Sequence, residues 1–333
     1  LPSIKFLNPM KLAFILDPIE RLDPTHDTTV ALMEAACTLG HEVYIAKMNS
    51  LQIRQSKAWA WLEPLSVAPV ALVNGHWVAA NPWYTLDKTG SSYQCLEAMD
   101  AAWMRVDPPV TTEYLYATYI LDYVDPRRTL VLNAPAGIRA ANEKMYALQF
   151  TSCIPETIVS ADKQVIRAFI QQQGKAVMKP LGGKGGEGIL FLTDGDPNFS
   201  SLTELSTNFG TMPVMVQAYL PEAKQGDKRI ILLDGQPLGA VNRIPASGEF
   251  RGNMAAGGRA DAIGLTPRDH EICQAVAPTL QRDGLMFVGL DVIGGYLTEV
   301  NVTSPTGVRE IDRFDQVRLG EQVIHWLGNQ KLS

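Results

Sequence analysis

The chain has 333 residues and a formal net charge of −6, from 29 Lys+Arg and 35 Asp+Glu. At ~100–200 residues per domain, this length predicts two or three domains. Hydrophobic residues make up 46% and charged residues 19%, which excludes a disordered or collagen-like chain. The acidic balance also disfavours a protein that binds by neutralising nucleic-acid phosphates. We therefore expect an enzyme that acts on small molecules, with no nucleic acid as a partner.

The cysteines are far apart in the sequence and form no C-x-x-C pair: Cys37, Cys95, Cys153 and Cys273. This spacing is typical of reduced thiols in a cytoplasmic protein and indicates neither a disulfide framework nor a zinc site. No apolar run reaches the ~18 residues that span a membrane, so we expect no membrane partner. Met10-Lys11 directly precedes the first strand-like run, and we expect residues 1–9 to be an upstream extension.

The pattern up to residue 134 predicts parallel βαβ units, in which buried strands alternate with covering helices. The predicted elements are, in chain order, strand 12–16, helix 28–39 ending at Gly40, strand 43–46, strand 102–106, helix 112–123 and strand 129–133. Residues 52–90 contain several prolines and tryptophans without a clean period. We interpret that segment as an irregular excursion or a hairpin.

Beyond about residue 140, short strands and tight glycine turns predict antiparallel hairpins. One such hairpin joins 230–233 to 238–243 through Asp234-Gly235. We predict domains over 10–134, 142–212 and 213–333, the first with a doubly wound parallel sheet and the other two forming an α+β region.

A run of glycines over 182–188 is the sharpest local signal. Gly183-x-Gly185-x-x-Gly188 has the dinucleotide-binding spacing, but the apolar strand-like run 189–192 follows where that motif requires a helix. A dehydrogenase is thus disfavoured. We predict a strand–loop–strand hairpin whose bare backbone N–H groups close over phosphate, the alternative being a flexible hairpin tip.

Lys179 ends the apolar run 176–178, in a strand that we expect to be buried on both faces. A buried ammonium requires an anion, and a phosphate under the glycine loop would supply it. The alternative is an edge lysine whose amine reaches solvent. Lys144, at a predicted helix start, is a weaker signal alone.

Asp291, Glu299 and Asn301 lie on two predicted strands that meet at Gly294-Gly295. A two-residue turn would pair Asp291 with Thr298, whereas a three-residue loop that includes Tyr296 would pair Asp291 with Glu299. Facing carboxylates at ~4 Å repel by ~4 kcal/mol at an effective dielectric constant of 20 unless a cation lies between them. We predict the three-residue register and a Mg²⁺ site of hard oxygen ligands. An exposed acidic hairpin is the alternative.

Three arginines recur at intervals of eight residues in a glycine-rich segment: Arg243, Arg251 and Arg259. This composition is typical of a mobile lid that brings guanidinium groups onto a transferring phosphoryl group, with Arg229 as a further cation. An ordinary basic surface loop competes with this interpretation. Arg105 ends a predicted strand, where open α/β sheets bind ligands, and is a candidate for binding a substrate carboxylate.

Together these features resemble the bacterial glutathione synthetases of the ATP-grasp superfamily. The resemblance extends from Met10 to Glu310 and is specific because seven motifs occur in the same order. They are Asp107-Pro-Pro, Tyr116-Ala-Thr-Tyr-Ile-Leu121, Asn142-Glu-Lys144, Gly226-Asp-Lys-Arg229, Arg251-Gly-Asn-Met-Ala-Ala-Gly-Gly-Arg259, Phe287-Val-Gly-Leu-Asp291 and Thr298-Glu-Val-Asn-Val-Thr-Ser-Pro-Thr306.

The resemblance implies an ATP-grasp fold and a role for each candidate residue. The ATP-binding set is Lys144, Lys179, Gly182, Gly183, Gly185, Gly186, Gly188, Gln217, Tyr219 and Leu220, with 215–220 beside the adenine. Asp291, Glu299 and Asn301 would hold Mg²⁺ or Mn²⁺. Residues 244–259 would form the flexible lid, with Arg229, Arg243, Arg251 and Arg259 as catalytic residues. Arg105, Ser304 and Thr306 would bind substrate.

Members of this family use ATP to phosphorylate γ-glutamylcysteine, and glycine then displaces the phosphate to give glutathione. The resemblance also implies a homo-oligomer in the cytoplasm. Two alternatives remain open: another ATP-grasp carboxylate-amine ligase, such as a D-alanine–D-alanine or peptide-tail ligase, and a non-catalytic ATP-binding regulatory protein.

Overall fold

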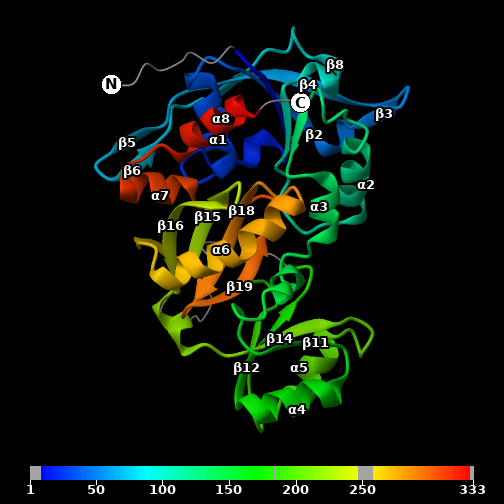
Figure 1. Cartoon of the computed structure of the whole chain (residues 1–333), viewed down its shortest axis with the longest axis vertical. Coiled ribbons are helices and arrows are strands. Elements are labelled where there is room, and N and C mark those ends of the chain that lie inside the picture. The colour runs from blue at the N-terminus through cyan, green and yellow to red at the C-terminus, as the bar shows by residue number, and fades with distance from the viewer. Residues whose placement is uncertain (1–8, 184, 247–257, 331–333) are drawn as a thin grey trace.

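The computed structural model describes residues 9–183, 185–246 and 258–330. An N-terminal α/β sheet lies at one end of the molecule and two antiparallel sheets follow it toward the other end (Figure 1). Within these residues, no helix has the length and apolar character needed to cross a membrane.

The N-terminal sheet contains the predicted parallel strands, in the order β10-β9-β1-β2. Their bounds are β1 (Lys11–Leu16), β2 (Glu42–Lys47), β9 (Ala101–Met104) and β10 (Leu130–Leu132). On one face, Phe14 packs with α1 (Thr28–Thr38) and α8 (Leu319–Asn329). On the other, Ile15 packs with α2 (Thr112–Leu121) and α3 (Pro135–Ala140). The doubly wound arrangement is thereby confirmed.

The segment 52–90 is more regular than we expected. Its long strand β4 (Lys57–Val67) runs antiparallel to β2 and pairs with β3 (Gln52–Arg54), β7 (Tyr84–Leu86) and β8 (Ser92–Cys95), while β5 (Ala71–Val73) and β6 (His76–Val78) form a separate hairpin. The hairpin interpretation is confirmed and the irregular one is wrong. Small Ala58 and Ala60 occupy the buried face of β4 while Trp59 and Trp61 occupy the other, so no polar–apolar alternation marks the strand.

The central sheet has the order β11-β14-β12-β13 and is covered by α4 (Lys163–Gln173) and α5 (Phe199–Ser206). Its strands are β11 (Thr157–Ser160), β12 (Lys175–Pro180), β13 (Leu190–Thr193) and β14 (Val214–Ala218). The hairpin predicted around the glycine run is confirmed, since β12 and β13 are antiparallel neighbours. Because β14 belongs to this sheet, we propose to divide the two later domains after Ala218 instead of at 212.

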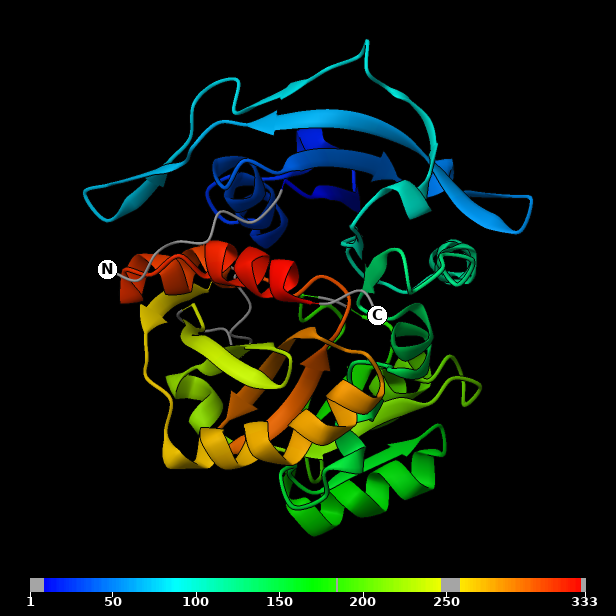
Figure 2. The same ribbon diagram turned by 45° about the horizontal axis from the view of Figure 1, so that its top comes forward.

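The third sheet has the order β17-β16-β15-β18-β19 and is antiparallel throughout. Its strands are β15 (Asp227–Leu233), β16 (Gln236–Ile244), β17 (Arg259–Ala262), β18 (Phe287–Ile293) and β19 (Tyr296–Asn301). The helix α6 (Pro267–Arg282) covers one face, and α7 (Val308–Asp315) and α8 lie between the other face and the N-terminal sheet (Figure 2). Short 3₁₀ turns complete the fold: η1 (Ile19–Arg21), η2 (Met48–Ser50), η3 (Leu96–Ala98), η4 (Met145–Gln149) and η5 (Pro221–Gln225).

The predicted lid segment differs from expectation at both ends. Residues up to Ile244 belong to β16, Arg259 begins β17, and Ile244 pairs with Arg259 across the two strands. The two ends of the predicted lid are therefore regular strand residues, because pairing between β16 and β17 satisfies their backbone groups. Residues 247–257, including Arg251, lie outside the described residues.

Candidate active site

A cavity of about 1140 Å³ receives lining residues from the two antiparallel sheets and from loops that follow strands of the N-terminal sheet. This volume exceeds the ≈300–1,000 Å³ of a typical small-molecule pocket, so it has room for more than one substrate. Glycine-hairpin and β14 residues line one end, charged residues of β15, β16, β18 and β19 line the middle, and loops 17–27 and 303–307 line the other end.

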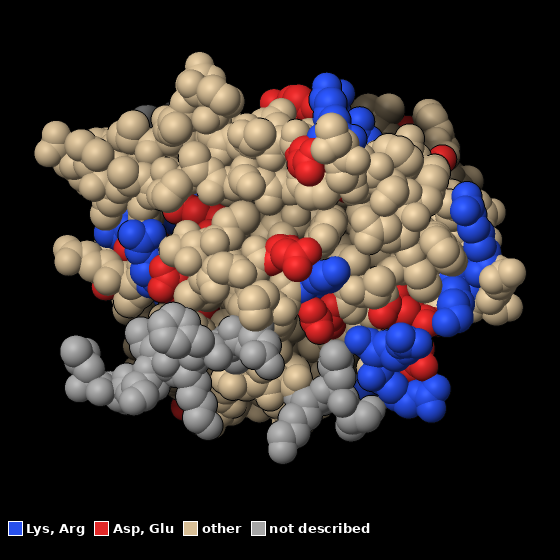
Figure 3. Space-filling view, turned by 90° about the horizontal axis from the view of Figure 1, so that it is seen from above, with Lys and Arg blue, Asp and Glu red and all other residues tan. Residues whose placement is uncertain are grey.

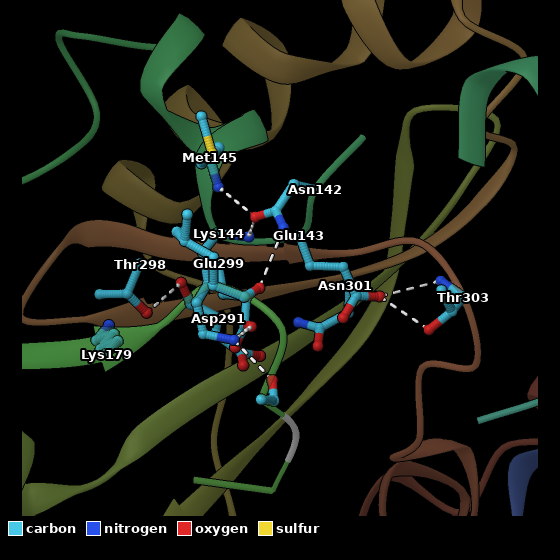
Figure 4. A network of polar contacts seen from close by, with 12 residues as sticks. Asn142, Glu143, Lys144, Met145, Lys179, Asp291, Thr298, Glu299, Asn301 and Thr303 are labelled. Carbon is cyan, nitrogen blue, oxygen red and sulfur yellow. Dashed lines mark hydrogen bonds and ion pairs between the residues drawn. The ribbon is translucent and has the colours of Figure 1, made fainter. Parts of the chain in front are cut away.

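Residues 142–144 hold two of these parts together (Figure 4). Asn142 Nδ2 donates to the carbonyl of Leu181 at 3.0 Å, at the base of the glycine hairpin. Lys144 is buried at the start of η4, and its Nζ lies 2.8 Å from Gly183 O and 3.0 Å from Glu299 Oε1. This cation therefore lies between the hairpin and the Glu299 carboxylate of β19.

Lys179 projects from β12 into the same cavity. Its Nζ lies 2.6 Å from Gln217 Oε1, and burial lowers the pKa of its ammonium. The expectation that this strand is buried on both faces is wrong. Ala176 and Met178 face the core, whereas Val177 and Lys179 are half-buried and line the cavity, because alternate residues of a strand face opposite ways.

Asp291 of β18 lies directly opposite Glu299 of β19, as predicted. The predicted reason was wrong. Ile293 pairs with Tyr296, which leaves a two-residue Gly294-Gly295 turn, and a bulge after Asp291 then shifts the register by one residue. An extra residue in one strand, Thr298, restores the pairing that a longer loop would have given.

The oxygen donors of this hairpin fit a divalent cation. Asp291, Glu299 and Asn301 all line the cavity. Asn301 Nδ2 donates to Gly289 O at 3.2 Å, and no described residue donates to its side-chain oxygen. Hard carboxylate and amide oxygens are the ligands that Mg²⁺ prefers. The described residues contain no cluster of three His, Cys, Asp or Glu side chains that suits a metal, so an amide and substrate phosphates would have to complete its shell.

Two arginines and two aspartates form a buried charge cluster next to Glu299. Arg229 contacts both carboxylate oxygens of Asp291, and Arg243 Nη2 lies 2.9 Å from Asp291 Oδ2 and 2.6 Å from Asp227 Oδ2. Burial alone would raise the pKa of Asp291, but the two guanidinium groups outweigh it and hold this pKa well below its usual range. Asp291 therefore stays ionised, as a metal ligand must.

Asp227 behaves in the opposite way. Its Oδ1 is buried and has no hydrogen-bond partner among the described residues. Burial raises the pKa of Asp227 to about 6, although Arg243 opposes the shift.

The arginines that we predicted to be catalytic do not all lie at the cavity. Arg229 and Arg243 line the cavity, whereas Arg259 is exposed and pairs with Asp261 at 3.3 Å. Its neighbour Ala260 faces the cavity in its place, because the two residues alternate on β17. A catalytic contact of Arg259 stays a prediction.

The predicted nucleotide residues are only partly at the cavity wall. Gly183, Gly185 and Gly186 line it, as do Gln217, Tyr219 and Leu220, whereas Gly182 and Gly188 are not part of the lining. Met215, at the start of the predicted adenine segment, is fully buried. Gly188 has φ +69° and lies against Pro180, so it shapes the turn instead of facing the cavity.

At the other end, Ser304 and Thr306 line the cavity, whereas Arg105 is buried behind them, and substrate binding by these residues stays a prediction. Its Nε donates to Thr29 Oγ1 and its Nη2 to Pro305 O, each at 3.1 Å, and burial lowers its pKa. Arg105 therefore contacts the loop that carries Ser304 and Thr306, but it does not line the cavity.

Sequence reasoning missed Glu143 and Asp227. Glu143 Oε1 accepts hydrogen bonds from Val302 N, Thr303 N and Thr303 Oγ1 at 2.9–3.1 Å, which fixes the chain just after Asn301. Burial, and then the charge of Glu299, raises the pKa of Glu143. Both acids adjoin a basic residue in a recognised motif, Asn142-Glu-Lys144 and Gly226-Asp-Lys-Arg229, which was the signal available.

Figure 3 shows one face of the molecule from above, where lysine and arginine side chains are interspersed with acidic ones. Within the described residues on that face, no continuous basic surface forms. This agrees with the acidic net charge of −6.

Two family models match the chain almost end to end. The prokaryotic glutathione synthetase N-terminal domain matches residues 10–139, and the ATP-grasp domain of the same family matches residues 143–316. The chain is 64% identical to a glutathione synthetase of Nostoc sp. over 96% of this chain and 98% of that protein. It is also 64% identical to one of Thermosynechococcus vestitus (96% and 99% covered) and 41% identical to one of Coxiella burnetii (96% and 96%).

Solved structures share the fold at low identity. A D-cycloserine synthetase aligns with TM-score 0.63 at 15% identity, over 94% of this chain and 99% of that one. A macrocyclase of Microcystis aeruginosa, bound with its precursor peptide, aligns with TM-score 0.62 at 14% identity, over 96% and 100%. The whole-chain family match, together with this shared ATP-grasp fold, shows that the chain belongs to the prokaryotic glutathione synthetase family of ATP-dependent ligases.

Proposed function

We propose that the cavity binds ATP, γ-glutamylcysteine and glycine together and joins the last two into glutathione, releasing ADP and phosphate. The observation that carries this proposal is the position of Lys144, between the glycine hairpin and the Asp291–Glu299 strand pair. A triphosphate chain held at this point would meet backbone N–H groups on one side and oxygen ligands for a cation on the other.

The nucleotide occupies the hairpin end of the cavity in this proposal. Tyr219 and Leu220 line that end and give the base an apolar surface, while Lys144 and Lys179 balance the charge of the phosphates. Gly183, Gly185 and Gly186 add backbone N–H groups without side chains that would obstruct the phosphates.

The reaction has two displacements. A carboxylate oxygen of the cysteinyl residue attacks the γ-phosphorus, the bond to the bridging oxygen breaks, and ADP leaves. The amine of glycine then attacks the acyl carbon, phosphate leaves with the bonding electrons, and the amine loses a proton. Phosphorylation is required because a free carboxylate has no adequate leaving group.

Asp291, Glu299 and Asn301 would hold Mg²⁺ or Mn²⁺, and Asp291 can contribute through Oδ1, which Arg229 occupies from one side only. When bound, the ion withdraws charge from the phosphoryl oxygens. Arg229 and Arg243 keep Asp291 ionised and supply positive charge beside the phosphates. The segment 244–259, with Arg251 and Arg259, closes over the reacting groups, because an acyl phosphate hydrolyses unless water is kept out.

Ser304 and Thr306 bind the dipeptide or glycine through their hydroxyl groups, and Arg105 acts by fixing the loop that carries them.

We also propose that the protein forms a homo-oligomer and is located in the cytoplasm. The four free cysteines support a reducing compartment.

Phosphate release with Mg-ATP tests the assignment. We expect rapid release when γ-glutamylcysteine and glycine are both present, with glutathione formed in equal amount. Glycine alone, or D-alanine in place of both, should give only a background rate. Equal release without the dipeptide would overturn the proposal, and release with D-alanine alone would instead indicate another ATP-grasp ligase.

A further inference from the structure

A chain of three polar side chains crosses the central sheet and ends at Lys179. Thr157 of β11 lies directly opposite Gln217 of β14, and Gln217 lies opposite Val177 of β12. Lys179 is two residues beyond Val177, so it shares that face of the strand. Thr157, Gln217 and Lys179 therefore follow one another across one face of three neighbouring strands.

The hydrogen bonds in this chain have a fixed direction. Thr157 Oγ1 donates its single proton to Pro155 O at 2.8 Å, so it can only accept from Gln217, whose Nε2 lies 3.1 Å away. The amide of Gln217 is then oriented with Oε1 toward Lys179, 2.6 Å from Nζ. The opposite orientation would place an NH₂ group against the ammonium, donor against donor.

Lys179 depends on that oriented oxygen. Gln217 is 3% exposed. Among the described residues, its Oε1 is the acceptor to which the Lys179 ammonium donates a hydrogen bond. Burial disfavours the charged form of Lys179 and lowers its pKa. An acceptor within hydrogen-bond reach offsets part of that cost and fixes where the ammonium lies.

We propose that Thr157 is a positioning residue for ATP binding, because its hydroxyl group orients Gln217 and Gln217 in turn places Lys179 in the nucleotide end of the cavity. Thr157 itself is not part of the cavity lining. The inference rests on the proposed function, specifically on contact between Lys179 and the phosphates of ATP.

The test is the Kd of Mg-ATP, measured by calorimetry on the full chain, together with the KM values for γ-glutamylcysteine and glycine. Thr157→Val keeps the shape and removes the hydroxyl, while Thr157→Ser keeps the hydroxyl. Thr203→Val is the matched control, since Thr203 is fully buried on α5 and its hydroxyl has no partner among the described residues.

Loss of one hydrogen bond in the chain should raise the Kd of Mg-ATP about three- to tenfold in Thr157→Val. Thr157→Ser should stay within about twofold of the wild type, Thr203→Val should not change ATP binding, and the KM values for the other substrates should be unchanged. Wild-type affinity in Thr157→Val, equal weakening in Thr157→Ser or Thr203→Val, or a matching rise in the KM for γ-glutamylcysteine would overturn the inference.

Lys179→Met separates the two proposals. We expect it to weaken ATP binding at least as much as Thr157→Val does. If Lys179→Met weakens ATP binding and Thr157→Val does not, only the positioning role of Thr157 is wrong. If Lys179→Met binds ATP as the wild type does, the proposed contact of Lys179 with the nucleotide is wrong and the role of Thr157 is overturned with it.

Discussion

Lys144 and Glu299 form an ion pair inside the cavity, with Nζ 3.0 Å from Oε1, and the same ammonium lies 2.8 Å from the carbonyl oxygen of Gly183. The two residues are 155 positions apart in the chain. One lysine thus contacts both the glycine hairpin and the oxygen cluster, the two parts that the proposed triphosphate site requires.

Replacing Lys144 by methionine removes this charge at nearly constant side-chain length. Charge-assisted hydrogen bonds contribute ~1.5–3 kcal/mol, so we expect the Kd of Mg-ATP to rise about ten- to a hundredfold. Lys163→Met is the control. Lys163 lies on α4, outside the cavity, and its Nζ pairs with Glu204 of α5 at 2.7 Å. Calorimetric titration with Mg-ATP measures the Kd of each variant. An unchanged Kd in Lys144→Met would show that Lys144 does not bind the nucleotide.

Glu299→Gln tests the cation site. An amide binds Mg²⁺ more weakly than a carboxylate, so turnover should fall at least tenfold and half-maximal rate should require more Mg²⁺. Glu271→Gln, on the exposed face of α6, should leave both quantities unchanged. Rates measured over a series of Mg²⁺ concentrations give the answer. The same Mg²⁺ dependence in Glu299→Gln and wild type would exclude Glu299 as a ligand.

Asp291→Asn should lower stability as well as activity. The substitution leaves Arg229 buried without its carboxylate partner, and breaking a buried pair in this way costs about 3–5 kcal/mol of unfolding free energy. Asp261→Asn breaks the exposed pair with Arg259 and should cost less than about 1 kcal/mol. Urea denaturation compares the two variants, and equal losses would contradict a buried charge cluster.

The raised pKa of Asp227 should make the free energy of unfolding depend on pH. Burial raises its pKa from 3.8 to about 6, so the folded protein holds this proton more tightly than the unfolded chain does. The stabilisation is fully present below pH 4 and is lost as the pH rises through 6. Relative to Asp227→Asn, the wild type should lose about 2 kcal/mol of unfolding free energy between pH 4 and 6.5. A difference between the two proteins that is constant over this range would contradict the raised pKa.

Two glycines of the hairpin should differ in their tolerance of alanine. Gly188 has φ +69°, and a Cβ there would lie 2.9 Å from Pro180 Cγ, whereas a Cβ at Gly182 meets nothing within 4 Å. Gly188→Ala should cost about 1–2 kcal/mol and weaken ATP binding, because an L side chain disfavours this backbone conformation. Gly182→Ala should remain near wild type. Thermal denaturation and ATP titration measure both effects. Equal stability and equal ATP affinity of the two variants would contradict the special role of Gly188 in the turn.

Much of the fold followed from local pattern. The strands 12–16 and 43–46, the helix between them and the glycine hairpin were predictable, because burial period and turn residues act over a few neighbours. The strand β4 was not, since small and aromatic residues occupy its two faces without a polar alternation. The pairing of Asp291 with Glu299 was predicted correctly through a wrong loop length, because a bulge leaves no sign in the sequence.

The sequence by itself determined the chemistry that this protein has available: a glycine hairpin for phosphates, lysines and arginines for charge, and oxygen donors for a cation. Only the tertiary structure decided which of these residues meet. It buried Arg105, which was expected to bind a substrate carboxylate, behind the loop of Ser304 and Thr306. It also turned Arg259 outward and brought Asp227 and Glu143 into the cavity lining. The physical reason is that side-chain type is local, whereas position in a cavity depends on strand register and packing between segments more than a hundred residues apart.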